Sequence, residues 1–465
     1  MAADWRAERQ GLSGGRGFEM AEDGLPVPRR HWAAGAIFLT LFMVMLDTSI
    51  ANIALPTIAL DVRATPADSI WVVNAYQIGI VMILLPVGAL AEIVGYRRVY
   101  TLGLAIFVAA SLGCAMSRNL PALALARFVQ GFGAASIYGV NAALVRFTYP
   151  RALLARGMAK NTTTVAIAAA VGPTVAAAIL AIASWRWLFA VNVPIGLLAL
   201  AVGARALPRA PTVAVPFDLR SAALNALTFS VGFLALDDIV HGMRSFRTAA
   251  MALIAATAGL ALVRRSHGRE RPLVPLDLLR IGILRLSYAT SSFSFGAQTA
   301  LMVALPFYLQ YRFGFDHVLI GLLITPMPLG IAAASLFIHA LIDRVEAGLL
   351  GGIGLIILAL AISLLAWLPS GAGALAIAAT MAVAGFGFGL FQTPNNRTML
   401  SMAPTHRSGA AAGMLATARL VGQMGGALAV SILFGYAGPA SIIPLLFVVA
   451  LAGWGALFSL RQLAA

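Results

Sequence analysis

The sequence predicts an all-α polytopic membrane protein with fourteen transmembrane helices. Of its 465 residues, 60% are hydrophobic and only 11% are charged, with a mean hydropathy of +0.90. A soluble protein of this length would need far more charged surface to stay dispersed. Apolar runs longer than about 18 residues recur along the chain, and each is long enough to cross the hydrocarbon core as a helix.

The predicted spans follow one another with mostly short polar connections. In order, they are 33–60, 69–90, 98–116, 121–145, 158–183, 186–204, 219–237, 247–264, 286–311, 318–341, 348–368, 372–395, 408–434 and 439–461.

The positions of the cations assign the loops to sides of the membrane. With an even number of spans, 24 of the 32 Lys and Arg residues lie on the side that holds both termini and six on the other, while Arg127 and Arg419 lie inside spans. Because Lys and Arg accumulate in cytoplasmic loops, we expect an integral protein of the cell (inner) membrane with both termini cytoplasmic. The scattered cations form no dense patch, which argues against a nucleic-acid partner.

A repeated loop pattern divides the chain into halves. "GALAEIVGYRR" (Gly88 to Arg98) follows the second span and "HALIDRVEAGL" (His339 to Leu349) follows the tenth, each with a carboxylate at the mouth of a cytoplasmic loop. Two parallel halves with a binding site between them are typical of secondary transporters. The predicted domains are a cytoplasmic polar tail (1–32), an N-terminal six-helix bundle (33–204), a two-helix insert with a cytoplasmic linker (205–285) and a C-terminal six-helix bundle (286–465).

One carboxylate lies deep in the first span, in "LDTSIANIALP" (Leu46 to Pro56). An acid at a helix centre in lipid costs roughly 2.5–3.5 kcal/mol, so Asp47 should face a wet cavity or a partner. A carboxylate that must be neutral or paired in an apolar wall can couple proton binding to a conformational change. The alternative is a hydrogen bond that only holds the helix in place. Thr48 and Asn52 share a face beside it, suited to substrate contact or to helix–helix contact.

Arg127 is the other buried charge of the first half. It cannot lose its proton, so it needs an anion, a carbonyl shell or water. Gln130 lies on the same face, while Gly131 allows another helix to come close. Arg127 therefore either tunes a nearby acid or forms a purely structural charge pair.

Other polar or helix-disturbing residues occur inside predicted spans. Gly172 and Pro173 should break or bend the fifth span, either for function or for architecture. "GFGFG" (Gly385 to Gly389) is interpreted as a small-residue packing surface. Asp237 and Asp238, at the end of the seventh span, are expected to be solvated loop charges. Side chains that either line the cavity or hold helices together are Tyr76, Tyr138, Gln392, Asn396 and Arg419.

Several motifs, in this order, resemble the major facilitator superfamily, and specifically its fourteen-helix drug:proton antiporter family of multidrug efflux proteins. They are "LDTSIANIALP", "GALAEIVGYRR", "ALARFVQGFGAA" (Ala124 to Ala135), "AVGPTVAAA" (Ala170 to Ala178) and "SWRWLFAVNVPIG" (Ser184 to Gly196). There are three departures. The loop motif has Glu92 and Ile93 where Asp-Arg is usual, its second copy keeps Asp343 and Arg344 but lacks the glycines, and the fifth-span motif continues with alanines in place of glycines.

The resemblance implies a major facilitator fold, with two six-helix bundles and a two-helix central insert. It implies that Asp47 is a functional acid, that Arg127 takes part in proton transfer, and that Gly172 and Pro173 form the antiporter motif. It also implies a cytoplasmic latch that stabilises the outward-facing state, formed by Gly88, Glu92, Gly95, Arg97, Arg98, Asp343 and Arg344.

The resulting hypothesis is a proton-coupled antiporter that exports amphipathic small molecules or drugs, including cationic ones, by alternating access. Its partners would be a small-molecule substrate, protons and the lipid bilayer; an accessory periplasmic protein is left open, and a monomer is expected. Two alternatives remain: a major-facilitator importer of a metabolite, and a non-transporting membrane sensor or structural protein.

The sequence argues against an enzyme, a cofactor and a metal site. Its six histidines are scattered without ligand spacing, and there is no HExxH, phosphate-binding loop or nucleophile motif. The single cysteine, Cys114, lies in an apolar segment, so neither a disulfide framework nor a cysteine metal site is expected.

Overall fold

The computed structural model is all-helical over the part of the chain that it describes, residues 24–210, 212, 216–240, 246–266, 276–341, 344–369, 371, 373–403 and 408–464. Within it, fourteen helical segments are long and apolar enough to cross a membrane, one for each predicted span. The helices are α1 (Arg29–Asp61), α2 (Pro66–Ser69), α3 (Trp71–Val94), α4 (Tyr96–Met116), α5 (Leu120–Thr148), α6 (Leu154–Ile182), α7 (Arg186–Ala190), α8 (Asn192–Ala206), α9 (Leu219–Val240), α10 (Phe246–Ser266), α11 (Gly282–Phe313), α12 (His317–Ile324), α13 (Pro326–Leu341), α14 (Ala347–Ala366), α15 (Ala374–Ser401), α16 (Ser408–Ala437) and α17 (Ile443–Arg461).

Some predicted boundaries were wrong. Helix α1 begins at Arg29, four residues before the predicted start of the first span. Helix α15 continues through Pro394 to Ser401, six residues beyond the predicted end of that span. Helix α6 also runs unbroken through Pro173, so these residues do not break the span; the predicted bend stays a prediction. Prolines are tolerated in membrane helices because neighbouring helices and side chains compensate the lost backbone bond.

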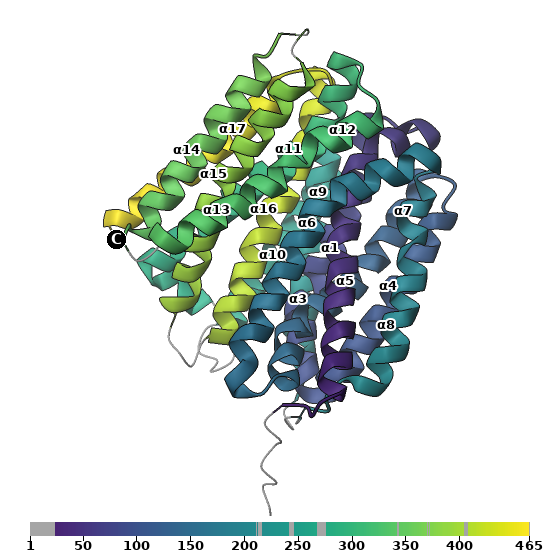
Figure 1. Cartoon of the computed structure of the whole chain (residues 1–465), viewed down its shortest axis with the longest axis vertical. Helices are drawn as coiled ribbons and strands as arrows, with labels where there is room; N and C mark the ends of the chain where they lie inside the picture. The colour runs from purple at the N-terminus through teal and green to yellow at the C-terminus, as the bar shows by residue number, and fades with distance from the viewer. Residues whose placement is uncertain are drawn as a thin grey trace, which may run out of the picture.

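The helices form two bundles with the same pattern of neighbours (Figure 1). In the first bundle, α1 packs on α6 and α8, α5 packs on α3 and α4, and α4 packs on α8. In the second bundle, α11 packs on α16 and α17, α15 packs on α13 and α14, and α14 packs on α17. The order of these contacts along the chain is identical, as expected for two structural repeats. The exact domain boundaries stay predictions.

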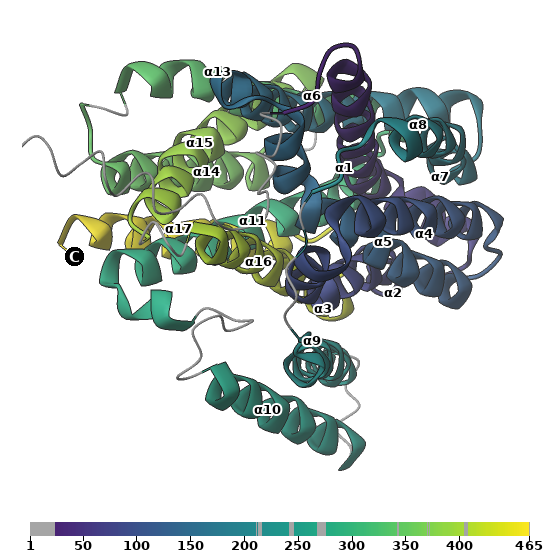
Figure 2. The same ribbon diagram turned by 90° about the horizontal axis from the view of Figure 1, so that it is seen from below.

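Helices α9 and α10 lie outside both bundles (Figure 2). Helix α9 packs against α3, where the amide nitrogen of Asn225 donates to the carbonyl oxygen of Met82 at 2.9 Å. Helix α10 packs on α9, and an Asp238–Arg247 ion pair of 2.6 Å joins the two helices. The expectation that Asp238 is a solvated loop charge was therefore wrong, because its side chain is only 7% exposed.

Glycines bring the helices close enough to place the buried polar groups. A Cβ on Gly131 of α5 would collide with the carbonyl oxygen of Tyr76 on α3. The predicted packing role of "GFGFG" is confirmed: side chains on Gly385 and Gly389 would collide with α13, and one on Gly387 would collide with α14. Small residues permit this approach because they have no bulky side chain. Helices in lipid depend on such close packing, since lipid tails supply no hydrophobic driving force between them.

The two bundles are joined near the end of α1 that carries Asp61, which we call the Asp61 end; the opposite end is the Arg29 end. Three hydrogen bonds link the bundles within the described residues, and all lie toward the Asp61 end. The first joins the hydroxyls of Thr174 and Thr325 at 3.0 Å. The second joins a ring nitrogen of His317 to the carbonyl oxygen of Leu180 at 3.0 Å. In the third, the hydroxyl of Ser431 donates to the carbonyl oxygen of Ala67 at 3.1 Å. This conformation is therefore held closed at the Asp61 end.

Candidate functional site

Asp47 and Arg127 form an ion pair inside the first bundle. The Nη1 atom of Arg127 lies 2.6 Å from Oδ2 of Asp47, and the side chains are 1% and 0% exposed, respectively. The two residues stand 80 positions apart, on α1 and α5. A charge buried alone in a medium of low dielectric constant is strongly unfavourable, so each side chain supplies the counter-ion that the other requires.

Further donors and acceptors complete this buried charge cluster. Oδ1 of Asp47 accepts from Nε2 of Gln130 at 3.0 Å and from Nδ2 of Asn192 at 2.7 Å. Nε of Arg127 donates to the carbonyl oxygen of Val72 at 3.0 Å. Nε2 of Gln130 also lies 2.8 Å from the hydroxyl of Ser111. The cluster therefore ties together α1, α3, α4, α5 and α8 around the carboxyl group of Asp47.

Aromatic rings cover the guanidinium of Arg127. Its Cζ atom lies 4.1 Å from the ring centroid of Tyr76 and 5.5 Å from that of Phe189. The hydroxyl of Tyr76 lies 3.4 Å from that of Thr48, and Tyr138 interacts with both hydroxyls. A cation over an aromatic face gains about 0.5–2 kcal/mol when desolvated. Tyr76 thus belongs to the cluster, and Tyr138 lies beside it.

Asn192 was missed by the sequence prediction, whereas Asn52 was predicted and lies outside the cluster. Asn192 stands within "SWRWLFAVNVPIG", where an amide in an otherwise apolar span was the signal that could have identified it. The side-chain oxygen of Asn52 is buried and accepts no hydrogen bond from the described residues. Its contribution to substrate binding stays a prediction.

The predicted latch residues lie at the Arg29 end. Gly95 has φ +102°, a backbone conformation that residues with a Cβ rarely adopt, which explains a glycine at the α3–α4 turn. Arg97 donates to the carbonyl of Ala204 and Arg98 to that of Val94, both in the first bundle. In the described residues, Glu92 makes no ion pair with the second bundle.

The remaining latch residues do not link the bundles in this conformation. Gly88 lies inside α3 with open space around it. Arg344 is exposed, and Asp343 lies outside the described residues. In a structure closed at the Asp61 end, none of the described latch residues forms a hydrogen bond or ion pair with the opposite bundle. Whether they join the bundles in another conformation stays a prediction.

The antiporter-motif residues lie where α6 meets other helices. A side chain on Gly172 would collide with that of Ser49 on α1, two residues after Asp47. The carbonyl of Pro173 faces Gly321 on α12, where a Cβ would approach it to 2.9 Å. The motif therefore contacts the helix that carries Asp47 and the helix that closes the Asp61 end.

The predicted polar residues of the second bundle are only partly buried. Gln392, Asn396 and Arg419 are partly exposed, and the buried side-chain oxygen of Asn396 has no hydrogen-bond partner in the described part. The Cζ atom of Arg419 lies 4.3 Å from the ring centroid of Phe295. The fully buried amide of this region is Asn395, which the sequence prediction missed; its Nδ2 donates to the hydroxyl of Ser291 at 2.9 Å.

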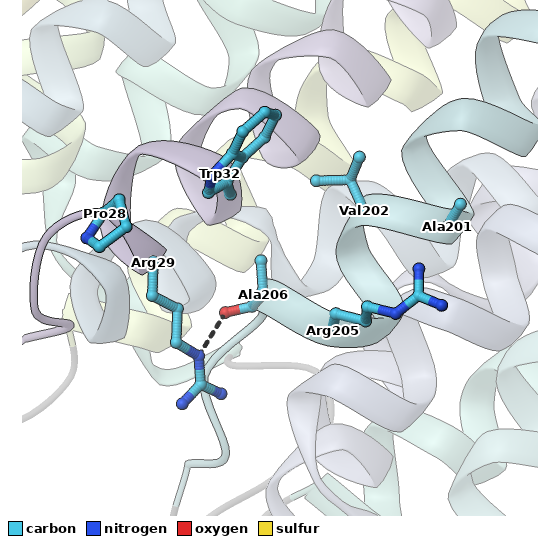
Figure 3. Close-up of a pocket in the computed structure, with 7 residues that line it drawn as sticks. All are labelled: Pro28, Arg29, Trp32, Ala201, Val202, Arg205 and Ala206. Atoms are coloured by element: carbon cyan, nitrogen blue, oxygen red, sulfur yellow. Dashed lines mark hydrogen bonds between the residues drawn. The ribbon is translucent and has the colours of Figure 1, made fainter.

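A surface groove of about 430 Å³ lies apart from the cluster, between the start of α1 and the end of α8 (Figure 3). Arg29 donates from Nε to the carbonyl of Ala206 at 3.1 Å, which fixes the end of α8 against α1. The groove is lined by Pro28, Arg29, Trp32, Ala201, Val202, Arg205 and Ala206. We therefore assign it to the surface at the Arg29 end and not to the central site.

Comparison with known proteins identifies the family. Residues 37–427 match the Major Facilitator Superfamily. The chain belongs to this superfamily. It is therefore a transporter and an integral membrane protein, and not an enzyme. A solved structure of a POT family transporter in complex with a thioalcohol-conjugated peptide aligns with a TM-score of 0.71, 14% identity, 93% coverage of this chain and 95% of that chain. That likeness shows the fold alone.

Three relatives of this transporter cover most of its length. It is 49% identical over 403 residues to the uncharacterized transporter YebQ of Escherichia coli K12, covering 86% of this chain and 88% of that one. It is 28% identical to the multidrug resistance protein Stp of Mycobacterium tuberculosis CDC 1551 / Oshkosh, covering 83% and 72%. It is also 28% identical to the riboflavin transporter RibZ of Clostridioides difficile 630, covering 82% and 83%.

Proposed function

We propose that this chain is a proton-coupled antiporter that exports amphipathic small molecules by alternating access. It would lie in the cell (inner) membrane with both termini cytoplasmic, since Arg and Lys are concentrated on that side. The observation that carries the coupling proposal is the buried Asp47–Arg127 pair. Asp47 is the one acidic group near the middle of a predicted span, and its partner keeps its charge at any working pH.

Protonation would act on this pair directly. A proton on Asp47 cancels the negative charge that Arg127 requires, and two unit charges about 4 Å apart attract by about 4 kcal/mol at an effective dielectric constant of 20. Asp47 is 0% exposed here, so proton exchange belongs to a second conformation in which water reaches the pair. The bundles would reach that conformation by parting at the Asp61 end and closing at the Arg29 end.

The direction of transport has two candidates. The relative Stp is described as a multidrug resistance protein, which supports export. The relative RibZ is described as a riboflavin transporter, which keeps import of a metabolite as the second candidate. Expression of this chain should lower the cellular accumulation of a labelled amphipathic compound; increased accumulation would favour import.

The coupling proposal is tested in proteoliposomes with an imposed pH gradient. Asp47→Asn should abolish gradient-driven transport of a dye that the wild-type protein moves, while dye counterflow without a gradient continues. Thermal unfolding and size-exclusion chromatography check that the variant is folded. Gradient-driven transport at the wild-type rate in Asp47→Asn would refute the coupling role.

Water access to the pair is tested by cysteine labelling. In a Cys114→Ala background, Asp47→Cys places one thiol at the site. A membrane-impermeant thiol reagent should label it in a conformation-dependent way, for example more rapidly with substrate present. Failure to label under every condition, while the variant still carries out dye counterflow, would contradict proton exchange at this position.

A further inference from the structure

Arg419 places a second guanidinium between the two bundles. It stands on α16, its Cζ atom lies 4.3 Å from the ring centroid of Phe295 on α11, and Tyr138 on α5 of the first bundle lies near it. Its side chain is partly exposed. Tyr138 also interacts with Thr48 and Tyr76, next to the buried charge cluster. Arg419 therefore lies across from the Asp47 site, on the opposite bundle.

Among the described residues, no carboxylate is paired with this guanidinium. Within the described residues, Arg419 makes no ion pair and no hydrogen bond, in contrast with Arg127. The sequence from 286 to 465 contains three acidic residues, Asp316, Asp343 and Glu346, all outside the predicted spans. Asp47, the remaining acid near a span centre, is already paired with Arg127.

A guanidinium within a membrane span is energetically unfavourable when it has no counter-ion. It remains charged at neutral pH, and an arginine within a membrane span normally faces a partner or a water-filled space. The ring of Phe295 offers a cation–π contact worth about 0.5–2 kcal/mol, which does not replace a counter-ion. A guanidinium presents five donors in a planar fork that matches an oxyanion, and none of them is used by the described residues.

We propose that Arg419 binds an oxyanion group, such as a carboxylate, sulfonate or phosphate, of the transported substrate. The aromatic or apolar body of the substrate would pack on Phe295 and Tyr138. This proposal rests on the proposed transport function and names its substrate class: amphipathic anions or zwitterions. The sequence-based hypothesis of amphipathic substrates left cationic ones open, and this proposal favours anionic ones because the carboxylate that would attract a cation is paired with Arg127.

The test uses three compounds with one aromatic body and different charge: naphthalene-2-sulfonate (anion), naphthalene-2-sulfonamide (neutral) and 2-naphthylmethylammonium (cation). A ligand that binds the folded state raises the unfolding temperature in proportion to its affinity. For the purified wild-type protein, the sulfonate should reach half-maximal stabilisation at a concentration at least about tenfold lower than the other two. In proteoliposomes, labelled sulfonate should enter by counterflow.

Two substitutions separate charge recognition from folding. Arg419→Gln should lose the tenfold preference for the sulfonate, whereas Arg419→Lys should retain part of it. Arg312→Gln is the matched control, since Arg312 also lies near an aromatic ring of the second bundle, that of Tyr308 at 5.4 Å. The control should keep the full preference, and unfolding curves without ligand show whether each variant is folded.

The outcomes distinguish the proposed anion site at Arg419 from the proposed proton-coupled transport. Equal stabilisation by all three compounds, no stabilisation by any, or an unchanged preference in Arg419→Gln would overturn the anion site. Gradient-driven transport of the cation or the neutral compound, without the sulfonate, would overturn the anion site and leave proton-coupled transport standing. Counterflow of the sulfonate without any effect of a pH gradient would support the anion site and contradict the coupling.

Discussion

The two bundles share one packing pattern but have different polar interiors. In the first bundle, α1, α5 and α8 meet at a charged cluster built on Asp47 and Arg127. In the second bundle, the corresponding helices α11 and α15 meet at neutral groups, where Nδ2 of Asn395 donates to the hydroxyl of Ser291 at 2.9 Å. The short helix η4 (Gln462–Ala464), which follows α17, adds a second neutral contact: Nε2 of Gln462 lies 3.3 Å from the hydroxyl of Thr290. The repeated helix packing thus tolerates either kind of interior.

This difference assigns different tasks to the bundles in the proposed mechanism. A neutral amide network keeps the same hydrogen bonds when the pH changes, so it is suited to a rigid role. A buried ion pair changes its energy greatly when one partner takes up a proton. We therefore expect the first bundle to respond to protons and the second bundle, through Arg419, to bind the substrate.

The largest expected effect comes from breaking the charged interior. Arg127→Gln leaves Asp47 buried without its counter-ion and should lower the free energy of unfolding by about 3–5 kcal/mol at neutral pH. Denaturant unfolding of the purified protein in detergent measures this. The double variant Asp47→Asn with Arg127→Gln should recover most of the loss because neither charge remains; a double variant as unstable as the single one would show that the pair is not the cause.

A smaller effect is expected at the edge of the same cluster. Asn192→Leu removes one hydrogen bond to the carboxylate of Asp47, and hydrogen bonds to charged groups contribute about 1.5–3 kcal/mol. The same unfolding measurement should therefore show a loss smaller than that of Arg127→Gln. A loss equal to that of Arg127→Gln would mean that Asn192, and not the ion pair, holds the site together.

The neutral interior of the second bundle should be less sensitive. Asn395→Leu removes two hydrogen bonds to α11, each contributing about 1 kcal/mol. Unfolding should show this modest loss, and gradient-driven transport should continue with the same dependence on the pH gradient. A change in the coupling of transport to protons would break the proposed division of tasks between the bundles.

The smallest effect is expected outside both bundles. Arg247→Gln removes the ion pair between α9 and α10, and the arginine side chain is 66% exposed. Because this pair lies outside both bundles, its loss should leave the transport rate in proteoliposomes equal to that of the wild-type protein. A loss of transport in a folded variant would show that the two-helix insert takes part in the transport cycle.

The sequence by itself determined the number and order of the spans and the presence of a buried acid and a buried arginine. Hydropathy and intramembrane charge are local properties, and the lipid environment enforces them at every position. The same local reasoning placed Gln130 on the face of Arg127, because residues three apart on a helix are neighbours.

Only the tertiary structure decided which of these groups meet. The pairing of Asp47 with Arg127 spans 80 residues, and Asn192 completes it from 145 residues away. Arg419 has no carboxylate partner among the residues that the structure describes. These outcomes depend on how closely the helices approach, as at Gly131 against Tyr76, and on the rotation of each helix about its axis. Neither quantity is encoded in a single segment, because both result from the packing of several helices at once.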